Sequence, residues 1–400
     1  MLRANPTRPA PSEISMQSPA TALSRRNGVA RLAFLASCCS LLLPAVSAAS
    51  PPDGIHVQGS GTPPQLAFGC CDQGIAPMQA LFADHEVIAA LHDMHAQVGV
   101  AVADFSPERV QVVRYLNQQQ IPVIAGVTLQ TKDGPYFNVD NVAEAPAQIA
   151  AFEKWTRDNG LRWDAVGIDI EPNFSQLAEL RNHRWRLVTT LLRNSLDGKR
   201  IQRAQEAYSA LIRQIQLQGY PVETYTLPYG PVERNLRTTL IDRLLGTVDV
   251  SANENDVMID TSYARPVGSA IILGLGPYSQ GILVGVTDGL TPAGSGFGPL
   301  DWDEFSNDLI VASHFAHHIG VYNLEGCVRH GYLPRLETMN WGESVVIPAA
   351  SVARARQHVM AFSIALWIAS RLPFLAAAVI LPAAFCIWWW RRRRLRLRHC

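Results

Sequence analysis

Apolar positions between residues 65 and 370 follow two alternating periods, one typical of strands and one typical of helices. Runs rich in Val and Ile predict eight strands, over 65–69, 98–103, 121–129, 163–171, 222–227, 257–259, 282–286 and 319–325. Stretches of helical period predict helices over 76–95, 107–119, 145–158, 175–218, 231–245, 267–275, 302–315 and 350–370, with a break near Asp197-Gly198 in the longest. Eight such pairs are the count of a (β/α)8 TIM barrel of class α/β.

The main alternative is an open, doubly wound sheet. Such a sheet needs a glycine-rich phosphate-binding turn directly after its first strand. The nearest candidate, Gly59-Ser60-Gly61, precedes the first predicted strand, and prolines follow it where a helix should begin. The barrel is therefore the preferred interpretation.

The fourth predicted strand carries the most informative pattern. Val166, Ile168 and Ile170 alternate with Gly167, Asp169 and Glu171, so one face is apolar and the other carries carboxylates. Pro172 should end the strand and leave Glu171 at the rim, where TIM barrels keep their catalytic groups. Carboxyl groups two residues apart on one face lie within about 7 Å of each other. One of them can then remain protonated and act as a general acid.

The two ends of the chain predict export and anchoring. Residues 1–49 have the arginines, apolar run and small-residue cleavage pattern of a signal peptide with a long n-region, and 50–64 form a Pro/Gly-rich leader. The predicted TIM-barrel domain spans 65–370. Residues 372–390 contain no charge and are long enough for a transmembrane helix, and the Arg-rich tail 391–400 should be cytoplasmic. We therefore expect a single-pass membrane protein with most of the chain on the periplasmic or extracellular side.

Charge and motifs narrow the chemistry further. Because the arginines gather at the two ends, the middle of the chain is acidic, which argues against nucleic acid as a partner. There is no Cys and His cluster with metal-ligand spacing and no Gly-x-Ser-x-Gly elbow, so the sequence predicts neither a metal nor another cofactor. His317 and His318 adjoin a strand start, at the opposite end of the barrel from the chemistry, and we interpret them as packing or surface residues.

If the barrel forms, the residues at the carboxyl ends of its strands share one mouth. Carboxylates, tyrosines and amides there suit a sugar, whose hydroxyls need hydrogen bonds and whose ring faces need aromatic surface. The candidates are Asp104, Thr128, Asp169, Glu171, Tyr225, Tyr229, Asp260, Tyr263, Asp288, Tyr322, Asn323 and Glu325.

The fourth strand resembles a known family. Its pattern Asp164-x-x-Gly167-x-Asp169-x-Glu171 resembles the Asp-x-x-Asp-x-Asp-x-Glu motif of glycoside hydrolase family 18, the chitinase-like TIM barrels, with Gly167 in place of the second acid. The resemblance implies a substrate containing N-acetylhexosamine. It implies that Glu171 protonates the glycosidic oxygen and that Asp169 orients the substrate's own N-acetyl group. Asp164 would support them, and Met258 with Tyr263 resembles the Met-x-Tyr of the family's sixth strand, at a wider spacing.

Two other functions remain open. Ile170-Glu171-Pro172 also resembles the Asn-Glu-Pro segment of retaining glycosidases, which pair their acid/base with a second carboxylate about 5–5.5 Å away. The seventh strand offers Asp288 for that role. Gly167, which interrupts the row of acids, suggests instead a barrel that binds glycans without turnover.

Three cysteines lie between the predicted signal peptide and the predicted span. Cys70 and Cys71 follow the first strand, and Cys327 follows the eighth. Because the first and last strands of a barrel are neighbours, we expect Cys327 to form a disulfide bond with Cys70 or Cys71.

Overall fold

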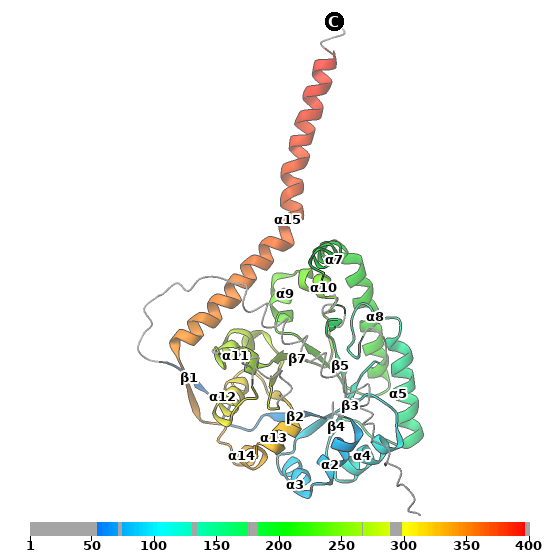
Figure 1. Cartoon of the computed structure of the whole chain (residues 1–400), viewed down its shortest axis with the longest axis vertical. Coiled ribbons are helices and arrows are strands. Elements are labelled where there is room, and N and C mark those ends of the chain that lie inside the picture. Colours follow the sequence, from blue (N-terminus) through cyan, green and yellow to red (C-terminus); the bar gives the residue numbers. More distant parts are fainter. Residues whose placement is uncertain are drawn as a thin grey trace, which may run out of the picture.

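Eight parallel strands close into a barrel, as the sequence predicts (Figure 1). The computed structural model describes residues 54–70, 74–129, 134–174, 176, 183–265, 267–288 and 298–396, with side chains described no further than residue 372. The barrel strands are β2 (Gln65–Cys70), β3 (Gln97–Val102), β4 (Val123–Val127), β5 (Ala165–Asp169), β6 (Val222–Thr226), β7 (Glu254–Ile259), β8 (Gly281–Gly285) and β9 (His318–Tyr322). The carboxylate-bearing strand, β5, is the fourth of the eight.

Helices surround the barrel and are α2 (Ile75–Ala83), α3 (His85–Asp93), α4 (Pro107–Gln118), α5 (Ala145–Asn159), α7 (Arg184–Leu196), α8 (Gly198–Leu217), α9 (Gly230–Leu236), α10 (Leu240–Leu245), α11 (Ala270–Leu275), α12 (Trp302–Ser313), α13 (Leu324–Arg329), α14 (Leu333–Glu337) and α15 (Ala349–Arg396). The expected break near 197 is confirmed. Asp197 lies between α7 and α8, and its carboxylate accepts a hydrogen bond from the backbone N–H of Arg200, 3.0 Å away, which caps α8.

Capping residues also divide two segments that the periodicity predicted as continuous. The expected helix 76–95 is two helices, because the side chain of Asp84 accepts a hydrogen bond from the N–H of Glu86 and begins α3. The expected strand 319–325 ends at Tyr322. Asn323 accepts a hydrogen bond from the N–H of Gly326 and begins α13, so Glu325 lies in a helix rather than on a strand.

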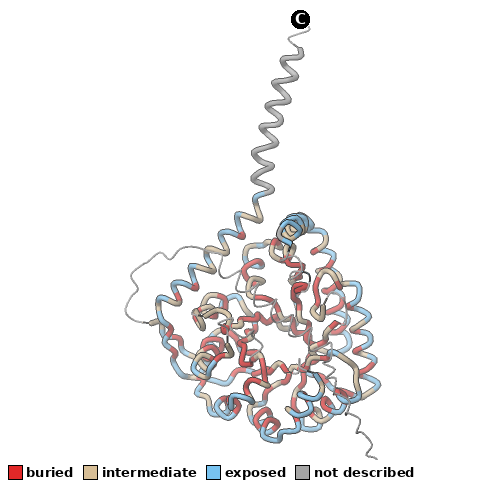
Figure 2. The backbone as a smooth tube through the Cα atoms, in the orientation of Figure 1, coloured by how far each residue is buried: buried red, intermediate tan, exposed pale blue. Residues whose placement is uncertain are grey.

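The strands present two different faces. β-Branched residues such as Val166 and Ile168 face outward and pack in the main hydrophobic core between strands and helices. Figure 2 shows this buried layer around the barrel and the exposed outer faces of the helices. The inward positions include apolar side chains such as Ile124, Met258 and Leu283, but many are small or polar, and five glycines line a cavity: Gly69, Gly99, Gly126, Gly167 and Gly320. The barrel interior is therefore partly hollow.

Segments outside the barrel meet in a second, smaller sheet. β1 (Ile55–Gln58), which falls within the predicted leader, pairs with β10 (Ser344–Ile347) in antiparallel register. The predicted signal peptide 1–49 and most of the tail 391–400 lie outside the described residues. The backbone of α15 runs through the expected span 372–390, whose side chains after residue 372 are not described. In the described part of the chain, no helix has both the length and the apolar character that a membrane crossing requires.

Candidate active site at the barrel mouth

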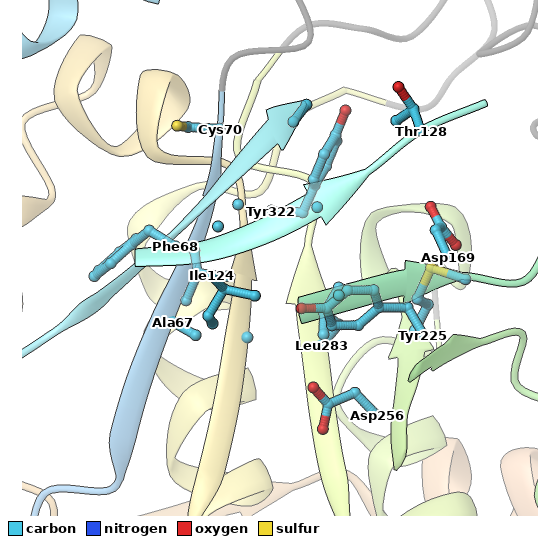
Figure 3. A pocket seen from close by; sticks show the side chains of 18 of the residues that line it. Ala67, Phe68, Cys70, Ile124, Thr128, Asp169, Tyr225, Asp256, Leu283 and Tyr322 are labelled. Atoms are coloured by element: carbon cyan, nitrogen blue, oxygen red, sulfur yellow. The ribbon is translucent and has the colours of Figure 1, made fainter. Parts of the chain in front are cut away.

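A cavity of about 140 Å³ extends along the inside of the barrel (Figure 3). Its upper end, at the carboxyl ends of the strands, is polar and includes five of the predicted mouth residues: Thr128, Asp169, Tyr225, Asp260 and Tyr322. Tyr136, from the loop after β4, joins them. The structure thus brings carboxylates, hydroxyls and aromatic rings from β4, β5, β6, β7 and β9 to one opening.

Gly167 has a structural reason to lack a side chain. A Cβ atom at this position would lie 2.9 Å from Cε2 of Tyr225 and 3.1 Å from its hydroxyl oxygen. The ring of Tyr225 therefore takes the space of the acid found at this position of the family 18 motif. Its hydroxyl donates a hydrogen bond to Oε2 of Glu223 at 2.8 Å. Tyr225 lines the cavity with its ring, while its hydroxyl is held by a buried carboxylate.

Asp169 and Glu171 occupy different environments. Asp169 ends β5, is partly exposed and lines the cavity. Glu171 is fully buried just beyond the strand, and its backbone N–H donates to the carbonyl oxygen of Phe137 at 3.1 Å. Glu171 is not among the residues that line the cavity. Of the two predicted catalytic acids, Asp169 lines the cavity, whereas Glu171 is buried and does not.

Several predicted mouth residues have other contacts. Asp104 forms an ion pair with the buried Arg109, 3.0 Å away. Burial would raise the pKa of Asp104, but hydrogen bonds from Arg109 and Ser106 lower it to about 2. Asp288 is buried and pairs with Arg329. Besides Glu171, the predicted mouth residues that do not line the cavity are Asp104, Tyr229, Tyr263, Asp288, Asn323 and Glu325.

Two predictions need correction. Asp164, expected to support substrate binding, is exposed at the amino end of β5, and its carboxylate accepts a hydrogen bond from Gln97. Because substrate would bind at the carboxyl ends of the strands, this position does not fit a contact with the sugar. The predicted disulfide bond of Cys327 is also wrong. Cys327 is a buried free thiol, 3.8 Å from the hydroxyl of Thr287, and Cys70 is disulfide-bonded to a residue other than Cys327.

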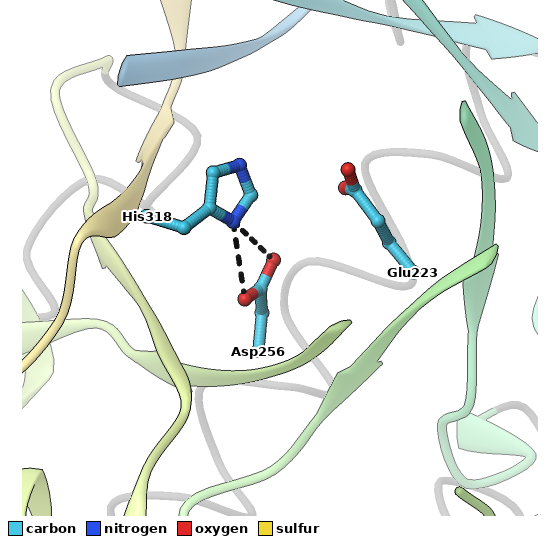
Figure 4. A group of neighbouring side chains, drawn as sticks. All are labelled: Glu223, Asp256 and His318. Carbon is cyan, nitrogen blue, oxygen red and sulfur yellow. Dashed lines mark hydrogen bonds and ion pairs between the residues drawn. The ribbon is translucent and has the colours of Figure 1, made fainter. Parts of the chain in front are cut away.

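The lower end of the cavity holds a cluster that the sequence did not reveal. Glu223 on β6, Asp256 on β7 and His318 on β9 meet inside the barrel (Figure 4). Burial raises the pKa of Glu223 to about 7. Burial would lower the pKa of His318, but hydrogen bonding and attraction from Asp256 and Glu223 raise it to about 9. His318 is at the amino end of its strand, as expected, but it faces the cavity and carries charge there.

Comparisons with known proteins assign no family. No protein-family model matches the chain, and no curated protein matches it. Solved structures similar to parts of it include a D-allulose 3-epimerase from Methylomonas sp. (11% identity, 79% of this chain and 98% of that one, TM-score 0.33). Another is a dihydropteroate synthetase (10% identity, 71% of this chain and 99% of that one, TM-score 0.31). A third is an endo-β1,6-glucanase (9% identity, 71% of this chain and 71% of that one, TM-score 0.33). At these scores they carry no argument about activity, and the barrel assignment rests on the strand order itself.

Proposed function

We propose that this chain is a glycoside hydrolase that binds its substrate at the mouth of the barrel. The observation that carries the proposal is the position of Asp169, which lines a cavity at the carboxyl end of β5 together with Asp260, Tyr136 and Tyr322. Tyrosine rings offer apolar surface to the faces of a sugar, and carboxylates accept hydrogen bonds from its hydroxyls. The volume of the cavity, about 140 Å³, is below the roughly 300–1,000 Å³ of typical ligand pockets.

The proposed substrate is a glycan that contains N-acetylhexosamine, and the proposed mechanism is acid catalysis with substrate assistance. The likeness of the β5 motif to family 18 supports both. In this mechanism Asp169 orients the N-acetyl group, whose oxygen attacks the anomeric carbon, and Glu171 donates a proton to the departing oxygen. A proton donor must come within about 2.6–3.2 Å of that oxygen. Because Glu171 is buried and does not line the cavity, the mechanism requires its side chain to turn toward bound substrate.

The remaining parts of the proposal rest on the sequence. No cofactor takes part in the proposed hydrolysis, and the glycan is the only proposed ligand of the mouth. The uncharged run 372–390 and the arginines after it favour attachment to a membrane, with the barrel on the periplasmic or extracellular side.

One observation favours a second function, glycan binding without turnover. Glu171 is fully buried and does not line the cavity, so a bound sugar could contact Asp169 without a proton donor within reach. The two-carboxylate mechanism with Asp288 has less support, because Asp288 pairs with Arg329 away from the cavity.

Hydrolysis of an N-acetylglucosamine oligomer by the purified full-length chain separates these functions. Glu171→Gln and Asp169→Asn should each abolish turnover, whereas Asp164→Asn, which changes an exposed carboxylate of the same motif, should not. Oligomer binding without turnover in the wild-type chain would support the binding barrel. Turnover that survives Glu171→Gln would refute Glu171 as the proton donor.

A further inference from the structure

The cluster at the lower end of the cavity has the composition of a metal site. Glu223, Asp256 and His318 each offer one ligand atom, and these atoms all lie within 4.8 Å of one another. The two carboxylates are 6% and 0% exposed, and the side chain of His318 is 14% exposed. The neighbouring strand leaves room for the group. A Cβ atom on Gly281 of β8 would lie 1.7 Å from Oδ1 of Asp256, so the missing side chain allows the carboxylate its place.

The distance between two members of the cluster fits a small divalent ion. Nδ1 of His318 lies 3.3 Å from each carboxylate oxygen of Asp256. Ligand atoms about 2.0–2.2 Å from a tetrahedral Zn²⁺ are themselves roughly 3.3–3.6 Å apart. Figure 4 shows the carboxylate of Glu223 facing this pair from the other side. Asp256 and His318 therefore already have the spacing of two ligands of one ion.

Two buried atoms of the cluster have no hydrogen-bond partner. Within the part of the chain that the structure describes, Nε2 of His318 makes no hydrogen bond, and Oδ2 of Asp256 makes none beyond its ion pair with Nδ1 of His318. A buried polar atom without a hydrogen bond is costly, so native structures seldom retain one without compensation. The cavity reaches both residues, which leaves space for a water as a further ligand.

The charges also favour a divalent ion over a proton. Glu254 acts electrostatically on His318 as well, so three carboxyl groups surround one imidazole. A single imidazolium offers one positive charge to them, whereas a metal ion offers two. Imidazole nitrogen suits Zn²⁺ better than Mg²⁺ or Ca²⁺, which prefer oxygen ligands.

We propose that Glu223, Asp256 and His318 bind a divalent transition-metal ion, Zn²⁺ by preference, inside the barrel. The three ligands come from the amino-terminal halves of β6, β7 and β9, where TIM barrels carry stabilising rather than catalytic groups. The ion would join these strands and close the floor of the cavity. This role does not depend on the activity proposed for the mouth.

Zinc binding by the full-length chain tests the proposal. The protein, purified without a polyhistidine tag and stripped with a chelator, is titrated with ZnCl2 by isothermal titration calorimetry. We expect one site and a zinc-dependent rise in Tm. His318→Gln should weaken this site by about 100-fold or more, because loss of even an outer-shell partner costs about 10–100-fold. His317→Gln is the matched control, since His317 is the exposed neighbour and should leave the site unchanged.

The other outcomes overturn the proposal. If the wild-type chain binds no Zn²⁺, the cluster is a buried ion pair between His318 and Asp256. If His317→Gln loses binding as much as His318→Gln, the ion binds at the surface. Should His318→Gln fail to fold, Glu223→Gln must show the loss instead, and unchanged affinity in that variant contradicts the assignment.

Helix α7 exposes a row of apolar side chains, which points to a second interaction surface. Trp185, Val188, Leu192 and Leu196 recur along one side of this helix and are 83%, 45%, 61% and 75% exposed. The surfaces of soluble proteins seldom expose so regular a row of apolar side chains. Arg186 and Arg193 lie on the same helix and are also exposed. An exposed Trp/Leu row with arginines beside it is typical of helices that lie in a membrane interface.

The position of α7 in the fold also points to a membrane surface as its partner. Both α7 and α15 pack against α10, and Figure 1 shows α7 beside α10, on the side of the molecule from which α15 extends. On α15, Ile364, Trp367 and Leu372 are 52%, 47% and 54% exposed, and the sequence continues from there with the uncharged run to residue 390. We infer that the apolar side of α7 lies on the surface of a lipid bilayer that contains anionic lipid.

Lipid quenching tests this contact. An environment-sensitive fluorescent amino acid replaces Leu192 in the full-length chain, which is reconstituted into vesicles of neutral and anionic lipid with brominated acyl chains. Leu217 is the control position. It is 87% exposed and ends α8, about 30 Å from α7 along that helix. We expect quenching at 192 and none at 217. Equal quenching at both positions, or none at 192, contradicts the inference, and a blue shift without quenching assigns the face to another protein.

Discussion

A methyl group at position 167 should destabilise the barrel because Tyr225 already fills the space. In Gly167→Ala the new atom would lie 2.9 Å from Cε2 of Tyr225, well inside the normal contact distance of about 3.5–4.0 Å. The ring must move by several tenths of an ångström, and its 2.8 Å hydrogen bond to Glu223 must move with it. Overpacking costs about 1–3 kcal/mol. Alanine also reduces the conformational entropy of the unfolded chain, which offsets about 0.4–1 kcal/mol of this cost. The free energy of unfolding of Gly167→Ala should therefore fall by about 1–2 kcal/mol.

Gly99→Ala provides the matched control. Gly99 also faces the cavity from a barrel strand, but the nearest atoms to its Cβ position lie 3.7 Å away, an ordinary contact. Its free energy of unfolding, measured by urea denaturation with tryptophan fluorescence, should stay the same or rise by up to about 1 kcal/mol. In a Tyr225→Leu background, Gly167→Ala should lower the free energy of unfolding much less, because the ring that it contacts is absent. Equal destabilisation in both backgrounds, or equal effects of the two glycine variants, would show that contact with the Tyr225 ring is not the cause.

Two further predictions concern buried titratable groups. Burial raises the pKa of Asp308 from 3.8 to about 7, so the folded state prefers the protonated form. The protonated carboxyl of Asp308 contributes its full stabilisation below the pKa of Asp308 in the unfolded chain, 3.8. This contribution is lost as the pH rises through the folded-state pKa of about 7. Asp308→Asn should therefore reduce the fall in Tm between about pH 4 and 8, and an unchanged Tm profile contradicts this. Burial raises the pKa of Cys327 to about 12, so a thiol reagent should modify it only in urea, and fast labelling of the native chain would show that it is accessible.

The sequence predicts the barrel well because its strands repeat one simple pattern. In β5, Val166 and Ile168 face the helices while Gly167 and Asp169 face the interior, as the period of two requires. The break at Asp197 follows from its capping chemistry. The end of β9 was placed too late because Asn323 stops the strand by capping α13, an effect that apolar periodicity does not contain.

The candidate site was less predictable because its members depend on side-chain direction. Asp288 and Asp169 both follow barrel strands, yet Asp288 pairs with Arg329 while Asp169 lines the cavity. His318 and Asp256 are 62 residues apart in sequence, and their contact depends on the register of β7, β8 and β9. The run of inward glycines is the one sequence signal that could have indicated a hollow barrel.

The proposed hydrolysis requires the carboxylate of Asp169 to act on a sugar at the barrel mouth. The most direct test compares kcat/KM for an N-acetylglucosamine oligomer between Asp169→Asn and Asp164→Asn, with folding of both variants checked by circular dichroism. Both changes remove one carboxylate from the same strand motif, but only Asp169 lines the cavity. We predict a fall of at least about 100-fold for Asp169→Asn, comparable to the loss of one stabilising contact in a transition state, and no fall for Asp164→Asn. Equal values for the two variants would contradict the account.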